Sequence, residues 1–257
     1  MTSSIVEAVG ERIRARRERL RMTQQDVANG LQVSAQAVSK WERGDNAPDV
    51  SVLVQLSQLL GVSLDWLLGG HDVGMEGGRP QEVLEATVMT VDLTGFSAAT
   101  MQLSQRDVAT WLNGRLYQIT EAILRHDGIP VKYLGDAVLA FFAGTQHRDR
   151  AVRAAFLARR TTETLTHVGL DTGKVYVGPV GHPDYAWRDI LGEPCFAVFN
   201  VERWAASKTQ SHVAATAALV RGLTDHVETV QSAVLSTGRK DRGNWMEWEV
   251  FELKMPD

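Results

Sequence analysis

The sequence has little that would tie it to an oxidising compartment or to a membrane. Its 257 residues contain one cysteine, Cys195, so no disulfide can form within the chain and a reducing compartment suits it. The first residues lack a basic segment followed by an apolar core, and no apolar run approaches the ~20 residues that a membrane-spanning helix needs. We therefore expect a cytoplasmic protein without a membrane partner.

A strong net charge is also missing. The 27 basic and 31 acidic residues leave a net charge of -4, so the chain as a whole is not attracted to nucleic acid or to anionic lipid. Any such binding must come from a local patch. The composition, 44% hydrophobic and 23% charged, is that of an ordinary globular protein, and the length allows two domains.

The first quarter of the chain has the apolar spacing of short helices. Apolar residues recur every three or four positions from Ile5 to Leu68, and turn residues separate the repeats. Thr23 and Ser34 are expected N-caps, and Gly30 is expected to end the helix that follows Thr23. A helix-turn-helix with a second helix of the right size for the DNA major groove follows. After a first helix from Ile5, the expected helices span 24–29, 35–43, 49–60 and 63–68.

The helix-turn-helix residues resemble a known DNA-binding family. Residues 22–28 (MTQQDVA) and 33–44 (VSAQAVSKWERG) are similar to the Cro and lambda-repressor-like (Xre) family over about 65 residues. The resemblance implies that Gln24 contacts the DNA backbone, that Gln36 can pair with adenine, and that Arg43 and part of the arginine cluster at 12–21 neutralise phosphates. Alternatively, these arginines form a solvated face of a protein-docking module. The residues implied to contact DNA are Gln24, Ala35, Gln36, Ser39, Lys40 and Arg43.

A glycine-rich stretch separates this module from the rest of the chain. Residues 69–81 hold five glycines and a proline without an apolar period, which predicts a flexible linker. The predicted domains are therefore residues 1–68 and 82–257.

Strands and helices alternate in the second predicted domain. The order β-α-β-β-α-β predicts a ferredoxin-like α+β domain, an antiparallel sheet with helices on one face. Gly135-Asp136 predicts a tight hairpin, and Gly173 is expected to separate two short strands. The expected strands are 84–91, 129–134, 137–142, 168–170 and 174–177, and the expected helices are 103–126 and 149–165.

The first strand ends in a carboxylate. Residues 88–91 would hold Asp92 at the strand's end, where it could supply the hard oxygen ligand that a divalent cation needs. Backbone N–H groups of residues 94–97 would then face a phosphate at the positive end of a helix. Alone, the pattern is a weak signal, because an Asp after a buried strand is often only the N-cap of the next helix. The four residues of this turn are Thr94, Gly95, Phe96 and Ser97.

Three separated motifs resemble the class III adenylate and guanylate cyclase catalytic domain. They are residues 91–97, residues 131–142, and residues 169–181 leading to 187–192, and the similarity covers roughly residues 84–253. The resemblance implies an antiparallel homodimer in which Asp92 and Asp136 hold Mg²⁺ or Mn²⁺ on a nucleotide. It also implies that Lys132 and Asp189 select adenine. Otherwise Asp136 serves only the hairpin turn, and Lys132 and Asp189 form a surface ion pair.

Two catalytic positions of that family are changed. The family pattern Gly-x-x-x-Asn-x-x-x-Arg begins here at Gly192, but Phe196 stands at the Asn position and Asn200 at the Arg position. Moving the register by four would use Asn200 for the ribose, with Trp204 at the Arg position and Arg203 one residue short. Losing charge that faces a transition state typically costs about 10²–10³ in rate, so we do not expect efficient catalysis.

The phosphate-binding lysine of the family has no certain counterpart. Arg239 or Lys240, near the end of the chain, is the candidate for its role. Phe196 would stack on a base or fill the ribose pocket.

Together these patterns predict a one-component transcriptional regulator. It would bind a palindromic DNA operator as a homodimer and sense an adenine or cyclic nucleotide through a catalytically impaired domain. Two alternatives stay open: an active adenylate cyclase regulated or localised by its DNA-binding domain, and a dimerisation domain that binds no ligand.

Overall fold

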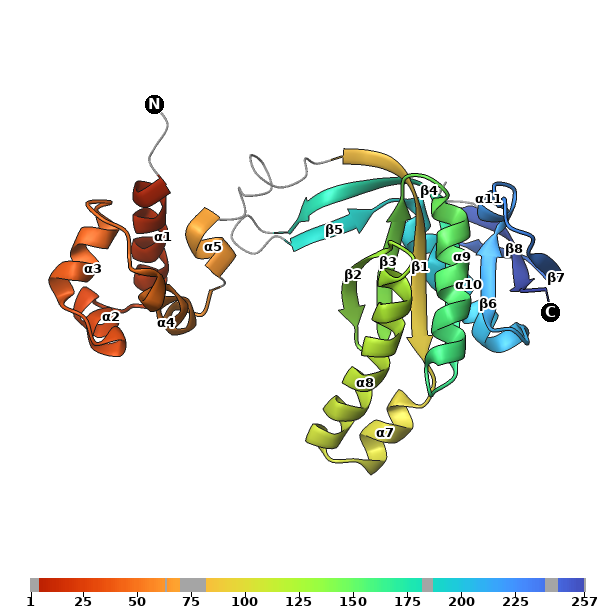
Figure 1. The fold of residues 1–257 in the computed structure, drawn as a ribbon, viewed down its shortest axis with the longest axis horizontal. Coiled ribbons are helices and arrows are strands. Elements are labelled where there is room, and N and C mark those ends of the chain that lie inside the picture. The colour runs from red at the N-terminus through yellow and green to blue at the C-terminus, as the bar shows by residue number, and fades with distance from the viewer. Residues whose placement is uncertain (1–4, 63, 70–81, 182–186, 239–244, 257) are drawn as a thin grey trace. The chain divides into compact units, whose positions relative to one another are not determined.

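The computed structural model describes residues 5–62, 64–69, 82–181, 187–238 and 245–256. These residues form two compact units, a helical unit and a sheet unit (Figure 1). Apart from Gly69, the predicted linker at 69–81 lies outside the described residues, so the domain boundaries stay predictions.

The helical unit consists of short helices around a small core. Ile13, Val27, Val38, Leu56 and Leu67 are fully buried in it, which accounts for the apolar spacing of the sequence. The helices are α1 (Ile5–Arg19), α2 (Gln24–Leu31), α3 (Ala35–Glu42), α4 (Val50–Leu60) and α5 (Leu64–Gly69).

The predicted N-caps of α2 and α3 are confirmed. The Thr23 side chain accepts from the N–H of Asp26, whose carboxylate accepts in turn from the N–H of Thr23, and Ser34 accepts from the N–H of Ala37. The predicted stop at Gly30 is wrong, because α2 continues to Leu31 and ends at Gln32 in the left-handed conformation.

Gly30 instead serves helix packing. A Cβ on this residue would lie 3.0 Å from Cδ2 of Leu59, so the glycine lets α4 approach α2 closely.

A buried ion pair joins the first three helices. Arg17 on α1 donates from Nε and Nη2 to the two carboxylate oxygens of Glu42 on α3, at 2.6 and 3.0 Å. The Gln24 amide on α2 donates to the same carboxylate at 2.7 Å. Glu42 is only 8% exposed, and the Arg17 guanidinium matches its charge inside the unit.

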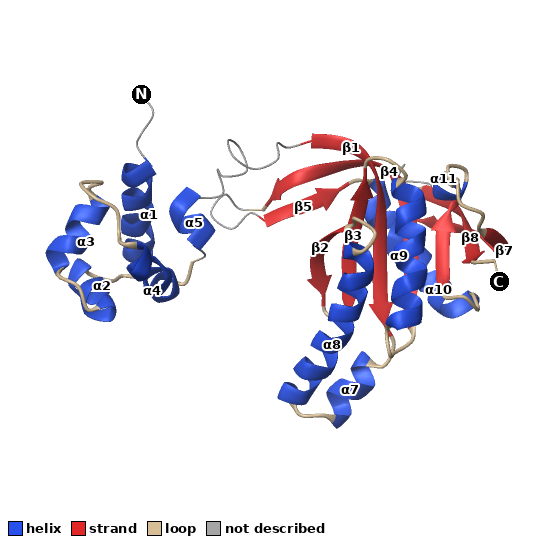
Figure 2. Ribbon diagram, in the orientation of Figure 1, coloured by secondary structure: helices blue, strands red, loops and turns tan. Residues whose placement is uncertain are grey.

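The sheet unit contains one sheet of eight strands within the described residues, in the order β2-β3-β1-β4-β6-β8-β7, with β5 paired to β4 (Figure 2). Along this order the strand pairs are antiparallel except β4 and β6, which are parallel. The strands are β1 (Glu82–Leu93), β2 (Ile129–Leu134), β3 (Ala137–Ala143), β4 (Thr166–Val180), β5 (Trp187–Leu191), β6 (Val213–Thr216), β7 (Glu228–Thr237) and β8 (Met246–Lys254).

Helices cover both faces of the sheet, not one face as predicted. Met89 and Val91 on β1 pack against α8 and α9, whereas Ala86 and Val88 point to the opposite face and pack with Val198 of α10. The strand period of two therefore gives β1 two buried faces. The helices are α7 (Phe96–Gln102), α8 (Gln105–Leu124), α9 (His147–Thr161), α10 (Glu193–Lys208) and α11 (Ala217–Val220).

The two short strands expected on either side of Gly173 are one strand of 15 residues, β4. Its register with β1 is continuous from Thr166 to Val177, through Gly173. A Cβ at Gly173 would lie 3.1 Å from Cγ of Pro194, so this glycine gives α10 room to approach and does not make a turn. The β2–β3 hairpin is confirmed, with Gly135 at φ 69°.

No helix within the described ranges is long and apolar enough to cross a membrane.

Candidate functional site

Asp92 and Asp136 lie beside each other at one end of the sheet. Asp92 is near the end of β1, and its partner in the register is Ala137, the first residue of β3. Asp136 immediately precedes that residue in the β2–β3 turn. The hairpin therefore brings together two carboxylates that are 44 residues apart in the sequence.

The electrostatics of this end show that the carboxylates interact. Burial raises the pKa of Asp92 to about 6, and the neighbouring Asp136 charge adds to the rise. A third carboxylate takes part, because burial and the charges of Asp92 and Asp136 raise the pKa of Glu202 to about 7, with Arg203 opposing the rise. We call Asp92, Asp136 and Glu202 the acidic cluster.

Sequence reasoning missed Glu202. Its place follows from the packing of α10 on β4 at Gly169, where an added Cβ would meet the Val198 carbonyl oxygen at 2.2 Å and the Glu202 nitrogen at 2.5 Å. Because Gly169 pairs with Thr90, the helix crosses the sheet two residues from Asp92. A charged residue amid the apolar positions of α10 was the one available signal.

The donor chemistry of this end fits a divalent cation. Carboxylates that repel each other gain when a cation lies between them, and Mg²⁺ in nucleotide sites uses one or two carboxylates with phosphate oxygens and water. Among the residues that the structure describes, no three His, Cys, Asp or Glu side chains are placed to hold one ion by themselves. A site based on Asp92 and Asp136 would therefore be completed by water or by oxygens of a ligand.

The turn after Asp92 is open to a ligand. Thr94 and Ser97 are exposed, Phe96 is half-buried, and Gly95 has φ 93°, a value that favours glycine. The helix that follows, α7, has only seven residues, so its dipole adds little. Thr94 is held by two hydrogen bonds to the start of β4, a backbone bond to Leu165 and a side-chain bond to His167.

Lys132 and Asp189, the predicted adenine-selecting residues, are brought together. Lys132 Nζ lies 2.5 Å from Asp189 Oδ2, and Asp189 Oδ1 accepts from the N–H of Ile190 at 2.8 Å. The side chains are 40% and 18% exposed. The pair thus presents a donor next to an acceptor, the pattern that matches N1 and the amine of adenine.

Cys195 lies near this pair. Burial raises the pKa of its thiol to about 11, the charge of Asp189 adds to the rise, and Lys132 opposes it. Such a thiol stays protonated at neutral pH and is a poor nucleophile.

Phe196 and Asn200 occupy α10 without replacing the lost catalytic groups. Phe196 is 48% exposed, and its ring centroid lies 6.0 Å from that of Trp248 on β8. The Asn200 amide donates to the Phe196 carbonyl at 3.2 Å, within its own helix. Arg203 is exposed on the same helix. Arg239 and Lys240 lie outside the described residues.

The predicted DNA-contacting side chains are mostly on α3. Gln36 and Lys40 are exposed, whereas Ala35 packs partly against the helical core. Arg43 donates to the Ser39 hydroxyl at 2.7 Å and pairs with Asp45 at 2.6 Å.

Three predicted contributors also have bonds within the unit. Gln24 and Arg17 bind Glu42, and Arg16 donates to the carbonyl of Leu60 at 2.8 Å. Part of the arginine cluster therefore stabilises the fold.

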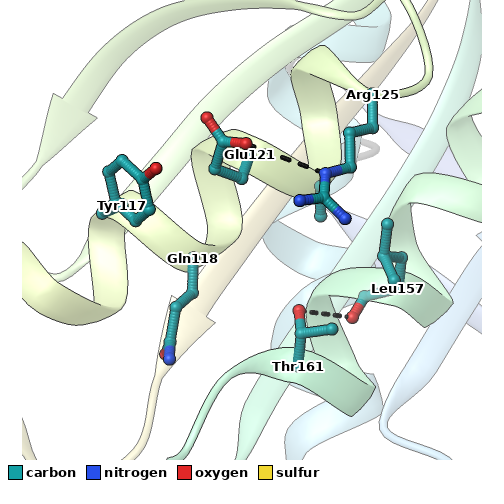
Figure 3. Close-up of a pocket in the computed structure, with 7 residues that line it drawn as sticks. Tyr117, Gln118, Glu121, Arg125, Leu157 and Thr161 are labelled. Atoms are coloured by element: carbon teal, nitrogen blue, oxygen red, sulfur yellow. Dashed lines mark hydrogen bonds and ion pairs between the residues drawn. The ribbon is translucent and has the colours of Figure 1, made fainter.

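Two pockets of the sheet unit lack the predicted site residues. A pocket of about 210 Å³ lies between α8 and α9, where Arg125 faces Glu121 at 3.7 Å and the Thr161 hydroxyl donates to the carbonyl of Leu157 (Figure 3). A second, of about 260 Å³, lies between β4, β8 and the start of α10. Its lining residues are Asp171, Thr172, Gly173, Lys174, Glu193, Pro194, Ala218 and Trp248.

Comparison with known proteins defines the helical unit. A family model described as helix-turn-helix matches residues 13–67. The HTH-type transcriptional regulator DicA of Escherichia coli is 45% identical over 64 residues, which cover 25% of this chain and 47% of that regulator. The helical unit is therefore a helix-turn-helix domain homologous to that of this regulator, and the predicted Xre resemblance is confirmed.

The sheet unit has the fold of class III nucleotidyl cyclase domains, as predicted. The guanylate cyclase domain of RhGC from Catenaria anguillulae, solved in complex with GTP, superimposes with a TM-score of 0.54 at 17% identity. The match covers 68% of this chain and 100% of that one.

A sequence relative agrees with this fold. Adenylate cyclase 1 of Rhizobium meliloti is 26% identical over 141 residues, covering 48% of this chain and 21% of that enzyme. The chain spans less than half the length of each of these two curated relatives. It thus joins a helix-turn-helix domain to a cyclase-fold domain.

Proposed function

We propose that this protein is a DNA-binding transcriptional regulator whose cyclase-fold domain binds an adenine nucleotide with Mg²⁺ or Mn²⁺ without efficiently cyclising it. The main support for this proposal is a contrast between the residues expected to bind the nucleotide and the residues at the family's catalytic positions. Asp92, Asp136, Lys132 and Asp189 stand in the pairs that nucleotide binding needs, whereas Phe196 and Asn200 stand where the family has its catalytic Asn and Arg.

Each group has a defined part in binding. Asp92 and Asp136 would hold the cation, which supplies positive charge against the phosphates. The exposed turn from Thr94 to Ser97 would offer hydrogen-bond donors to phosphate oxygens, and the Lys132–Asp189 pair would contact the adenine edge.

The helix-turn-helix domain would carry the output. Gln36 and Lys40, exposed on α3, would contact base edges in the major groove, and Arg43 would leave Asp45 for a phosphate. In a homodimer, a ligand that changes the interface would change the distance between the two helix-turn-helix domains. DNA binding would respond, because half-sites lie about 34 Å apart.

An active adenylate cyclase is the second candidate function. It is favoured by the same four residues and by the similarity to adenylate cyclase 1, whose name states that activity. The loss of transition-state charge at Asn200 argues against ordinary turnover, since such a loss typically costs about 10²–10³ in rate.

One paired experiment separates these functions. The full chain is titrated with ATP and Mg²⁺ in a calorimeter, and the same mixture is assayed for cyclic AMP. Heat without product supports the proposed sensor. Product at ordinary enzyme rates establishes the cyclase, and neither heat nor product leaves a dimerisation domain that binds no nucleotide.

The DNA-binding part has its own test. Fluorescence anisotropy with random-sequence and selected DNA should show salt-dependent binding that Gln36→Ala weakens most on the selected site. Equal binding of both DNAs would contradict base readout by α3.

A further inference from the structure

The open turn after Asp92 is held from the side by a histidine of another strand. Thr94 Oγ1 lies 2.9 Å from His167 Nε2, and the N–H of Thr94 donates to the Leu165 carbonyl at 2.9 Å. His167 is also the register partner of Asp92. Because paired residues of neighbouring strands point to one face, Asp92 and His167 lie on the face that α10 covers. The hydrogen bond to His167 brings Thr94 beside them.

His167 is held in turn by a second histidine. The rings of His167 and His212 lie edge to face with centroids 4.9 Å apart. The backbone of His212 is fixed, because its carbonyl accepts from Val168 at 2.9 Å and its N–H donates to the Thr209 hydroxyl at 3.1 Å. Thr209 follows the last residue of α10, so the histidine pair connects the end of that helix with the Asp92 turn.

The direction of the bond to Thr94 follows from what is left unpaired. The Nδ1 atom of His167 is buried and has no hydrogen-bond partner among the described residues. A neutral imidazole carries one N–H, and an N–H left without a partner in the interior is costly. The proton therefore belongs on Nε2, where it is donated to Thr94 Oγ1.

This arrangement leaves the Thr94 proton free. A hydroxyl has one donor and two acceptor positions, and His167 uses an acceptor position. Thr94 is exposed, so its O–H can turn towards a ligand beside Asp92.

We propose that His167 is a positioning residue of the nucleotide site: it donates to Thr94 Oγ1 and so directs the Thr94 hydroxyl proton to a phosphate oxygen of the bound nucleotide. This inference rests on the proposed nucleotide binding. His167 itself does not touch the ligand.

The first test is a double-mutant cycle on the full chain, read by calorimetric titration with MgATP. His167→Leu and Thr94→Val should each weaken binding by about tenfold, the size of one lost hydrogen bond to a charged group. The double variant should be no weaker than either single variant, within twofold. Independent losses that multiply, or a His167→Leu variant with wild-type affinity, would overturn the proposal.

Conservative variants separate positioning from general stability. His167→Gln places an amide N–H close to the Nε2 position and should bind MgATP within threefold of wild type, and Thr94→Ser, which keeps the hydroxyl, should do the same. Because Thr94 is exposed, Thr94→Val tests the proposal even where a His167 variant fails to fold. Full loss in Thr94→Ser would overturn it.

A readout without nucleotide distinguishes this inference from the proposed function. Hydrogen exchange in the peptide covering residues 93–100 should speed up about tenfold in His167→Leu and stay near wild type in His167→Gln. A wild-type chain that gives no heat with MgATP would overturn the proposed function and the phosphate role together. Unchanged exchange in His167→Leu would overturn the positioning role alone.

Discussion

Glu42 of the helical unit and the acidic cluster of the sheet unit are buried carboxylates in opposite surroundings. In the helical unit Glu42 is matched by Arg17 and Gln24, with both oxygens bonded. In the sheet unit Asp92 and Glu202 are also partly buried, but their neighbours include other carboxylates, and the pKa of each rises. The first arrangement stabilises a fold, whereas the second leaves the unit short of positive charge that a ligand can bring.

The largest effect is expected from breaking the matched pair. Arg17→Met leaves Glu42 buried without its cation and should lower the free energy of unfolding of the helical unit by about 3–5 kcal/mol. Urea unfolding followed by far-UV circular dichroism measures it. Arg14→Met, which removes only the exposed Arg14–Glu18 pair, is the control and should change it by less than about 0.5 kcal/mol. Equal changes in the free energy of unfolding for Arg17→Met and Arg14→Met would show that Glu42 does not depend on Arg17 to match its buried charge.

Removing the charge of Glu202, a carboxylate without a matching cation among the residues that the structure describes, should raise the free energy of unfolding. The pKa of Glu202 is about 7, above the ordinary value of about 4.3, so its ionisation destabilises the folded state as pH rises through that interval. Glu202→Gln should therefore stabilise the sheet unit by about 1–2 kcal/mol at pH 8, allowing for solvent screening, and by little at pH 4.

Urea unfolding at both pH values checks this prediction. Glu228→Gln, at an exposed position at the start of β7, is the control and should change the free energy of unfolding by less than about 0.5 kcal/mol. A Glu202→Gln variant that is less stable at both pH values would show that the charge is matched in a way like that of Glu42.

A divalent cation should supply the missing charge, in competition with protons. Because the pKa of Asp92 is about 6, the Mn²⁺ affinity of the full chain should increase about tenfold between pH 5 and pH 7.5. Free Mn²⁺ measured by electron paramagnetic resonance gives this affinity. Asp92→Asn should remove the pH dependence, whereas Asp127→Asn, at an exposed position after α8, should keep it. A Mn²⁺ affinity that does not change with pH would argue against Asp92 as a ligand.

The smallest effect concerns the exposed pair. Lys132→Met should change stability by less than about 1 kcal/mol, because exposed ion pairs contribute little. The same change should reduce the preference for ATP over GTP by about fivefold in competition titrations, since it removes a donor to the adenine edge. Arg125→Met, which breaks the exposed pair with Glu121, should alter neither quantity.

A structural feature of this protein is predictable from the sequence when it depends on adjacent residues, and is not when it depends on packing between distant segments. The N-caps at Thr23 and Ser34 and the hairpin at Gly135 are local features, and they are confirmed because each depends on a few adjacent residues. The breaks predicted at Gly30 and Gly173 are wrong, because a glycine that admits a neighbouring helix looks the same in a sequence as one that ends an element.

The site shows the same limit. The pairs Asp92–Asp136 and Lys132–Asp189 follow from motifs, but Glu202 and His167 come near the candidate site only through packing between distant segments. No pattern along the chain marks such contacts, so they had to come from the fold.

Gly169 has no side chain, and this affects the acidic cluster. The spacing between the helix that bears Glu202 and the strand that bears Asp92 is determined by the absence of one carbon atom. A position without any functional group thus determines how strongly the carboxylates repel one another. Random mutagenesis that selects for altered ligand response should therefore find variants at residue 169, and a survey restricted to ionisable side chains would miss them.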